Sequence, residues 1–314
     1  MTPGVIVMAY GTPRDLDDVE RYYTDIRHGR SPSPELLAEL TARYEAIGGR
    51  SPLYEITEAQ RVGLEKRLDG VPTYLGQKHS PPFIADAVRA AAGDGVDRIV
   101  GLVLAPHYSK MSVGDYRRRV LLARDESGLD APVDVVESWH LEPGYVSFLA
   151  ERVRAAVARL SPEARTRHVV VFTAHSLPEA ILRGGDPYPA QLEETAGAVA
   201  AAAGVSDHTI GWQSAGRTSE PWLGPDVLEV IERLASEGAR GVVVCPCGFV
   251  SDHLEVLYDV DVECAGAARR LGIELVRTES PNDDPEFLDV LAAVVRRKLD
   301  DDRSPRRSAK NNRS

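Results

Sequence analysis

Residues 168–178 read HVVVFTAHSLP, an apolar run that leads into a polar loop. Apolar and polar residues do not alternate in this run, as they would in a strand with one face in solvent. The run therefore predicts a strand of a parallel sheet that is buried on both faces. Residues 5–13, VIVMAYGTP, have the same form and also end at a proline. The two stretches together predict a chain built from two similar halves.

Apolar runs of this kind recur along the chain and alternate with helical spacing. Predicted strands lie at residues 5–8, 73–75, 99–104, 133–136, 169–172, 209–212, 242–245 and 274–276. Apolar residues three and four apart predict helices between them, including residues 35–47, 56–68 and 285–299. Thr57 and Gln60 are expected to form a capping box at the start of the second of these helices. This alternation is typical of the α/β class and of parallel sheets covered by helices.

Four predicted strands precede about residue 145 and four follow it, and the third run of each half ends at a proline, Pro106 or Pro246. We therefore expect two similar doubly wound, Rossmann-like domains, each with a four-stranded parallel sheet, over residues 1–145 and 146–302. The length also allows a single large α/β domain. Ligands of open parallel sheets bind beyond the carboxyl ends of the strands, so the expected site is a cleft between two facing domains.

The charge balance limits the classes of partner. The 314 residues include 48 acidic and 37 basic ones, for a net charge of −11. This argues against nucleic acid, which is bound through clustered Lys and Arg, and favours cations. Residues 303–314 carry five basic and no acidic residues and lack an apolar pattern, which predicts a disordered basic tail. Without a long apolar run or a signal peptide, we expect a cytoplasmic protein with no stable membrane insertion.

The most informative acidic residues are Glu255, Asp259 and Glu263, which recur every four residues. On an α-helix they would share one face, drifting by roughly 40° per step. Like charges at this spacing destabilise a helix, and residues 241–268 contain no Lys or Arg to offset them. The row therefore suits a divalent cation with oxygen ligands. The alternative is a solvated acidic face.

His175 follows the buried run of residues 168–174, at the expected carboxyl edge of the sheet. An imidazole there suits a proton acceptor or a metal ligand, the alternative being a loop histidine satisfied by backbone groups. His79 and His107 share this position. Cys245, Cys247 and Cys264 lack the fourth cysteine that structural zinc and iron–sulfur sites normally need, so small buried side chains are the favoured interpretation.

Arginines are concentrated near the N-terminus, at Arg21, Arg27, Arg30, Arg43 and Arg50. Because guanidinium groups pair bidentately with carboxylates, this cluster could hold a polycarboxylate ligand, although surface ion pairs with neighbouring acids are an alternative. No GxGxxG, Walker, GxSxG or HExxH motif occurs, so dinucleotide, nucleoside triphosphate and common hydrolase functions lose their usual support.

Nine motifs occur in a consistent order: VMAYGTP (7–13), RYEAIGG (43–49), SPL (51–53), LAPH (104–107), TAHSLP (173–178), GDPY (185–188), GWQS (211–214), PWLGP (221–225) and GFVSDHLE (248–255). Together they resemble the ferrochelatase family over about residues 4–300. The chain looks most like the soluble, monomeric members of Gram-positive bacteria, which insert ferrous iron into coproporphyrin III. The resemblance implies the chelatase fold and this reaction in haem b biosynthesis.

The resemblance also implies roles for particular residues. His175 and Glu255 would face the porphyrin centre from one side as catalytic and metal-binding residues, and Tyr10 would face it from the other. Asp259 and Glu263 would continue the metal path outward. Porphyrin propionates would be held by Arg27, Arg43, Ser51 and Tyr116. His79 matches a cleft histidine of less clear role.

Three other functions stay open at this point. The same chemistry could act on protoporphyrin IX, the cleft could belong to a porphyrin or haem carrier, or the chain could be a two-domain metal-binding protein of periplasmic type, which the missing signal peptide disfavours. Ferrous iron is expected as a substrate. Some family members hold an iron–sulfur cluster through cysteines of a C-terminal extension, and residues 303–314 contain none, so no cluster is expected.

Overall fold

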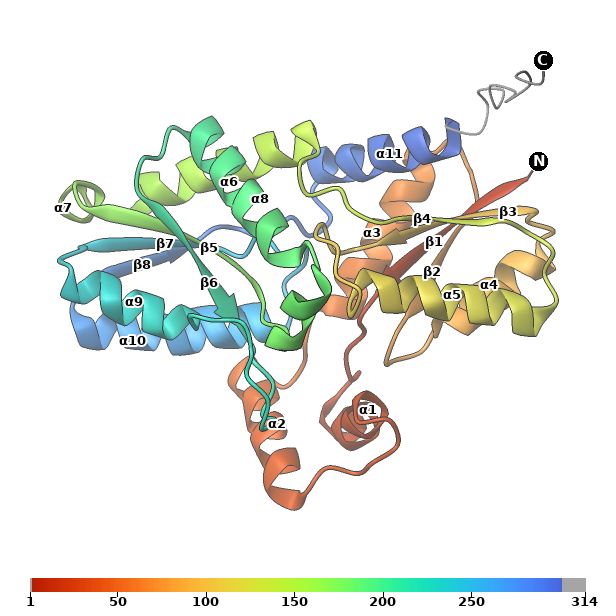
Figure 1. Ribbon diagram of the computed structural model, residues 1–314, viewed down its shortest axis with the longest axis horizontal. Coiled ribbons are helices and arrows are strands. Elements are labelled where there is room, and N and C mark those ends of the chain that lie inside the picture. Colours follow the sequence, from red (N-terminus) through yellow and green to blue (C-terminus); the bar gives the residue numbers. More distant parts are fainter. Residues whose placement is uncertain (1, 301–314) are drawn as a thin grey trace, which may run out of the picture.

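The computed structural model describes residues 2–300 and contains two four-stranded parallel sheets (Figure 1). The first sheet has the order β2-β1-β3-β4, with β1 (Pro3–Ala9), β2 (Thr73–Gln77), β3 (Arg98–Val103) and β4 (Val133–Val136). The second has the order β6-β5-β7-β8, with β5 (His168–His175), β6 (His208–Gln213), β7 (Gly241–Cys245) and β8 (Glu274–Arg277). All eight predicted strands and the predicted fold class are confirmed.

Helices connect the parallel strands, as crossover connections require. In the first half they are α1 (Val19–Ile26), α2 (Pro34–Ala46), α3 (Leu53–Arg67), α4 (Ile84–Gly93) and α5 (Val113–Ser127). From there on they are α6 (Pro143–Arg159), α7 (Pro162–Arg165), α8 (Tyr188–Ala203), α9 (Val227–Ser236), α10 (Ala265–Leu271) and α11 (Pro285–Asp300). Short 3₁₀ turns lie at Leu16–Asp18 and Glu179–Gly184, and residues Val256–Cys264 form a π-helix. No helix within residues 2–300 is long and apolar enough to cross a membrane.

The predicted capping box of Thr57 and Gln60 is wrong. Helix α3 begins at Leu53, so both residues lie inside it. The Thr57 hydroxyl donates to the Leu53 carbonyl at 2.6 Å, a bond made within one helical turn. Gln60 instead points away from its own helix and bonds to the second half of the molecule.

Alternate residues of the strands face two different cores, as the two-residue period of a strand dictates. In β1, Val5 and Val7 join a central core, whereas Ile6 and Met8 join a separate core beneath α4 and α5. The second sheet repeats this arrangement, with Phe172 facing the central core and α9 covering the other face. The central core is continuous between the two sheets and is formed with α3, α6, α8 and α11. The two halves are therefore packed as one body.

The two halves match in detail beyond their strand order. Each second strand ends at a glutamine, Gln77 or Gln213. In each half the loop that follows is tied back by a proline carbonyl, which accepts from the N–H of Gln77 at 2.7 Å in the first half and from that of Trp212 at 3.0 Å in the second. A duplicated architecture explains why motifs of similar form follow β1 and β5.

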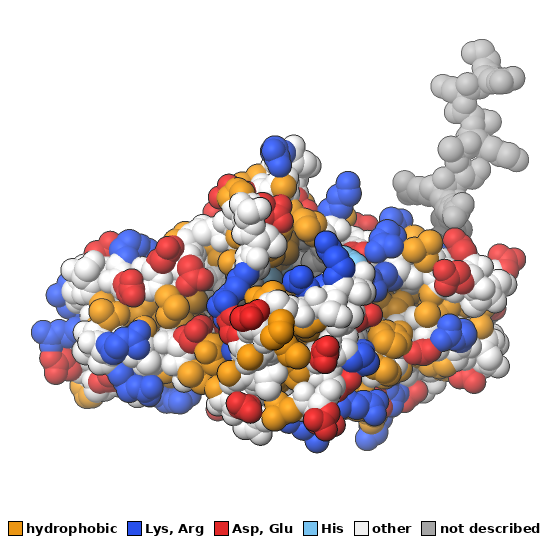
Figure 2. Space-filling model, turned by 90° about the horizontal axis from the view of Figure 1, so that it is seen from below, with side chains coloured by type: hydrophobic (Ala, Val, Ile, Leu, Met, Phe, Trp, Pro, Cys, Tyr) orange, Lys and Arg blue, Asp and Glu red, His pale blue; other side chains and the backbone are white. Residues whose placement is uncertain are grey.

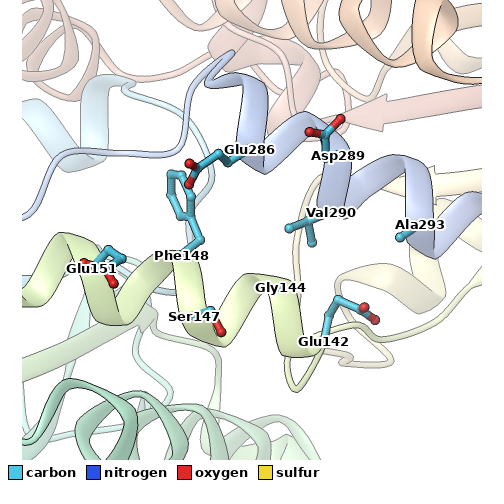
Figure 3. Close-up of a pocket in the computed structure, with 9 residues that line it drawn as sticks. All are labelled: Glu142, Gly144, Ser147, Phe148, Glu151, Glu286, Asp289, Val290 and Ala293. Carbon is cyan, nitrogen blue, oxygen red and sulfur yellow. The ribbon is translucent and has the colours of Figure 1, made fainter.

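The last helix crosses from the second half back to the first. Helix α11 packs against α3 and α6, and the Arg98 guanidinium of β3 donates to the carbonyls of Lys298 and Leu299 at 2.9 Å. A cavity of ≈ 380 Å³ lies between α6 and α11, lined partly by Phe148 and Glu286, and none of the predicted site residues lines it (Figure 3). The division at residues 145 and 146 falls within α6 and stays a prediction, and residues 303–314 lie outside the described residues.

Candidate active site

The carboxyl ends of both sheets point toward the middle of the molecule, above α1 and α2 (Figure 1). His175 is the last residue of β5, and Tyr10 directly follows β1. Seen from below, this middle region is hollowed, with Lys and Arg side chains around the hollow and histidine within it (Figure 2). The predicted location of the site, beyond the carboxyl ends of the strands, is where the structure is hollowed.

A carboxylate between two histidines forms the centre of the second half's side of the site. The Nε2 atom of His175 lies 3.5 Å from one oxygen of Glu255, and the Nε2 atom of His253 lies 3.5 Å from the other. The Nδ1 atoms of the two rings face backbone carbonyls, those of Ser176 and Ser251. Each imidazole is thus oriented by a carbonyl on one nitrogen and directed at the carboxylate through the other.

This arrangement shifts the protonation of His175 and Glu255 in opposite directions. Burial acts to lower the pKa of His175. The charge of Glu255, its hydrogen bond to His175 and the hydrogen bond to the Ser176 carbonyl act in the opposite direction, and together they raise the pKa of His175 to about 9. Burial works to raise the pKa of Glu255, but His175 and His253 hold it well below its usual range. At neutral pH the pair is an imidazolium next to a carboxylate, which holds a proton that an arriving cation could displace.

His253 was not predicted as a site residue. The only local signal was its place two residues before Glu255 in the sequence DHLE, which by itself does not distinguish it from other loop histidines. Its ring lies 4.9 Å from that of Phe249, centroid to centroid, and its position opposite His175 depends on the turn between residues 250 and 255.

That turn is held by buried polar groups. Asp252 accepts hydrogen bonds from Arg277 at 3.1 Å, Ser280 at 2.7 Å and Asn282 at 3.0 Å. Gln60, which is 0% exposed, directs its Nε2 group at the carbonyls of Asn282 at 2.7 Å and Val250 at 3.1 Å. Because buried polar groups are costly when unpaired, this network ties the Glu255 segment to α3 of the first half.

The acidic row begins at Glu255 and runs along the π-helix rather than the expected α-helix. The π-helix bonds from i to i+5, so its turns are wider, and such segments are frequent at functional sites. Asp259 is 6% exposed and accepts a hydrogen bond from Ser214. Burial, together with the charges of Glu255 and Glu263, raises the pKa of Asp259 to about 7. The hydrogen bond from Ser214 and the charge of Arg43 act to lower this pKa but are outweighed. Among residues 2–300 no three His, Cys, Asp or Glu side chains are arranged to hold a metal ion, so the metal role of His175, Glu255, Asp259 and Glu263 stays a prediction.

Tyr10 and Tyr116 come together on the first half's side of the site. The Lys78 ammonium lies 5.8 Å from the Tyr10 ring centroid and 5.3 Å from that of Tyr116, and it pairs with Asp115 at 2.7 Å. Tyr10 is 42% exposed, yet loss of water around its hydroxyl and the Glu255 charge raise the pKa of Tyr10. Lys78 and Asp115 are further charged groups at this site that sequence analysis did not identify.

His79 packs against Tyr10, with the ring centroids 4.6 Å apart, and its Nδ1 atom lies 2.6 Å from Asp25. Burial lowers the pKa of His79 to about 4 even though Asp25 acts to raise it. His79 is therefore neutral at pH 7, in contrast to His175. The first half thus contributes a neutral histidine to the site, and the second half contributes a protonated one.

The other residues predicted to bind porphyrin propionates differ in how close they lie to the site. The Arg43 guanidinium lies 5.0 Å from the Tyr258 ring centroid on the π-helix, so α2 contacts the acidic row. Ser51 is buried, and its hydroxyl accepts from the N–H of Leu53 at 3.3 Å at the start of α3. Arg27 stacks on Tyr23 at 5.7 Å, and none of its described contacts brings it to the other predicted site residues.

Several other candidates have structural roles. Arg21 pairs with Asp18 at 2.5 Å and Arg50 pairs with Glu55, in agreement with the surface ion-pair interpretation. His107 is buried and bonds Thr195 of α8 at 2.9 Å instead of facing the hollow. Cys245, Cys247 and Cys264 are buried thiols in the cores, and burial raises the pKa of Cys245 to about 12.

Comparisons with known proteins agree with the fold. A solved structure of SirB from Bacillus subtilis with Fe³⁺ has a TM-score of 0.58 at 10% identity, over 97% of this chain and 98% of that one, which shows a shared fold.

Two relatives named coproporphyrin III ferrochelatase are much closer in sequence. The protein of Geobacillus thermodenitrificans is 49% identical over 95% of this chain and 96% of its own length. That of Bacillus subtilis is 47% identical over 94% of this chain and 97% of its own length. The family model described as "Ferrochelatase" matches residues 2–299. Because the family model matches nearly the whole chain and the relatives are almost 50% identical, the chain belongs to the ferrochelatase family.

Proposed function

We propose that this enzyme inserts ferrous iron into coproporphyrin III and releases Fe-coproporphyrin, or coprohaem, as a step of haem b biosynthesis. The observation that carries the proposal is the 3.5 Å pair of His175 and Glu255 at the carboxyl edge of the second sheet, with Tyr10 at that of the first. The relatives named for coproporphyrin III support the choice of porphyrin.

Metal insertion exchanges one Fe²⁺ for the two protons of the pyrrole N–H groups, so the site must attract a dication and take up protons. Glu255 is the proposed group that attracts the dication, and His175 is the proposed group that takes up protons, because an approaching dication lowers the pKa of a neighbouring imidazolium and displaces its proton to water. The freed imidazole nitrogen can then accept the two pyrrole protons one at a time, passing the first to water before it takes up the second. Glu255 stays charged throughout and stabilises the positive charge that passes by it.

Ring distortion is the other requirement. A flat macrocycle directs its four nitrogen lone pairs inward and offers little access to a metal ion above the plane. Two halves that share one continuous core form rigid walls, which can bind the bent ring better than the flat one. Tyr10 would press on the ring from the face opposite His175.

Substrate preference tests the proposed porphyrin. Coproporphyrin III carries four propionates and protoporphyrin IX carries two, so the smaller number leaves part of the Arg27, Arg43, Ser51 and Tyr116 set without a carboxylate partner. We expect kcat/KM for anaerobic Fe²⁺ insertion to be at least about 10-fold higher for coproporphyrin III. Equal values for the two porphyrins would contradict the proposed preference, and a higher value for protoporphyrin IX would favour that substrate.

The acidic row is proposed to guide iron to Glu255. Above pH 7, where Asp259 is ionised, Asp259→Asn removes one negative charge without changing the shape of the side chain, so we expect KM for Fe²⁺ measured there to rise about 3- to 10-fold. Asp261→Asn is the matched control, because Asp261 lies on the same π-helix but pairs with Arg277 at 2.8 Å. Initial rates at varied iron concentration provide the measurement, and an unchanged KM in the Asp259 variant would count against metal delivery.

The cytoplasmic location, the monomeric state and the expectation of no iron–sulfur cluster stay predictions of the sequence.

A further inference from the structure

Two arginines from different halves of the molecule share one carboxylate at the edge of the site. Arg43 Nη2 lies 3.3 Å from one oxygen of Glu39, and both residues belong to α2. Arg217, in the loop after β6, pairs with the other oxygen of Glu39. The two guanidinium groups thus share the single Glu39 carboxylate, and because a guanidinium has five N–H donors, both can also pair with another carboxylate.

This cluster adjoins the site. The Arg43 guanidinium lies over Tyr258, and its charge acts on the neighbouring Asp259. Ser214, three residues before Arg217, bonds directly to Asp259. Basic side chains stand around the hollow in the same view from below (Figure 2). A carboxylate held by Arg43 and Arg217 would therefore lie at the edge of the site and not on a distant surface.

The chemistry of Glu39 indicates what this place accepts. A glutamate side chain is two methylene groups and a carboxylate, and so is the propionate substituent of a porphyrin. The ion pairs are partly open to water, with side chains 28% exposed for Arg43, 33% for Glu39 and 64% for Arg217. Pairs this exposed are weak and exchange readily, so a substrate carboxylate can take the place of Glu39.

We propose that Arg217, together with Arg43, forms a carboxylate-binding subsite for one propionate of the porphyrin, and that Glu39 is an internal competitor for it. This inference rests on the proposed function, since it names one more group that recognises the same substrate. Arg217 comes from the second half and Arg43 from the first, so a bound propionate would join α2 to the loop after β6.

The subsite predicts opposite effects of two single substitutions. Arg217→Gln removes a donor and should raise the Kd for coproporphyrin III about 2- to 5-fold, whereas Glu39→Gln removes the competitor and should lower it by a similar factor. Quenching of porphyrin fluorescence in the absence of iron measures both values. The Arg233→Gln and Glu237→Gln variants are matched controls, because they break an exposed Arg–Glu pair of 3.3 Å on α9.

A merely structural ion pair predicts a different result. Either substitution would then break the pair, and both variants would shift Kd in the same direction or not at all, which would overturn the subsite. Circular dichroism melting curves verify that the variants are folded. If the unaltered enzyme inserts iron normally but the two variants do not shift Kd in opposite directions, the subsite alone is overturned. If the unaltered enzyme does not bind coproporphyrin III, the proposed function is overturned as well.

Discussion

His175→Ala is expected to lower kcat for iron insertion by about 10²- to 10⁴-fold, the usual cost of losing a general base. The loss follows from the position of His175, whose Nε2 atom faces Glu255 while its Nδ1 atom is held by the Ser176 carbonyl. Coproporphyrin binding should change only a few-fold, because the propionates are held elsewhere. Anaerobic formation of coprohaem, followed by its absorption spectrum, measures the first effect, and fluorescence quenching measures the second.

His168→Ala is the matched control, since His168 begins the same strand β5 that His175 ends. Its Nδ1 atom faces the Arg165 carbonyl at 2.7 Å, at the end of the strand opposite to His175. Turnover should therefore be retained in this variant. If His175→Ala retained full turnover, the assignment of His175 would be wrong. Binding of coproporphyrin III by the unaltered protein without any iron insertion would instead favour the carrier interpretation.

Glu255→Gln is expected to lower kcat about 10²-fold and to move the pH dependence of the rate toward acid. In the unaltered enzyme Glu255 helps to raise the pKa of His175 to about 9, so the neutral imidazole grows in population as pH rises toward 9, and the rate should rise with it. Without the charge, burial dominates and lowers the pKa of His175, so the rate should reach its plateau at lower pH. The lower plateau reflects the lost stabilisation of passing positive charge.

The control for this variant is a second Glu–His pair outside the hollow. Glu194 lies 2.8 Å from the Nε2 atom of His140, and Glu194→Gln should leave the pH–rate profile in place. The raised pKa of His175 also has a consequence for stability. The proton on His175 stabilises the folded chain fully below pH 6.5, and this contribution is lost as pH rises through about 9, whereas the contribution of Glu255, whose pKa is lowered, is lost as pH falls into the acid range. An unchanged pH–rate profile in Glu255→Gln would contradict the proposed coupling.

Most of the fold could be predicted from local patterns. All eight strands lie where apolar β-branched runs predict them, because a strand buried on both faces needs such a run. The helix beginning at Pro285 was also predicted, with its proline at the first turn, where a missing N–H is tolerated. The start of α3 was not, because Thr57 and Gln60 fit a capping box in sequence but their bonds are decided by Leu53 and by the other half of the chain.

The site was predictable only in part, for the same reason. His175, Tyr10 and Glu255 lie at strand ends or in a distinctive acidic segment, and in the structure His175 lies 3.5 Å from Glu255, whose charge also acts on Tyr10. No local pattern distinguishes His253, Lys78 or the Glu39–Arg217 pair from other polar residues of the chain. Glu39 and Arg217 are 178 positions apart, and a contact across such a separation depends on how two sheets, a protruding α2 and one loop are placed in space.

The α/β class, the two similar halves and the positions of the chemically distinctive residues could be predicted from the amino-acid sequence, because these follow from periodicity and from which residues end each strand. The protonation of those residues depends on how the chain packs in three dimensions. Two histidines at equivalent sheet edges have pKa values of about 9 and about 4, since His175 faces the Glu255 carboxylate whereas burial outweighs Asp25 at His79. Burial and the distance to neighbouring charges are properties of the packed chain, and they make one histidine of the site protonated and the other neutral.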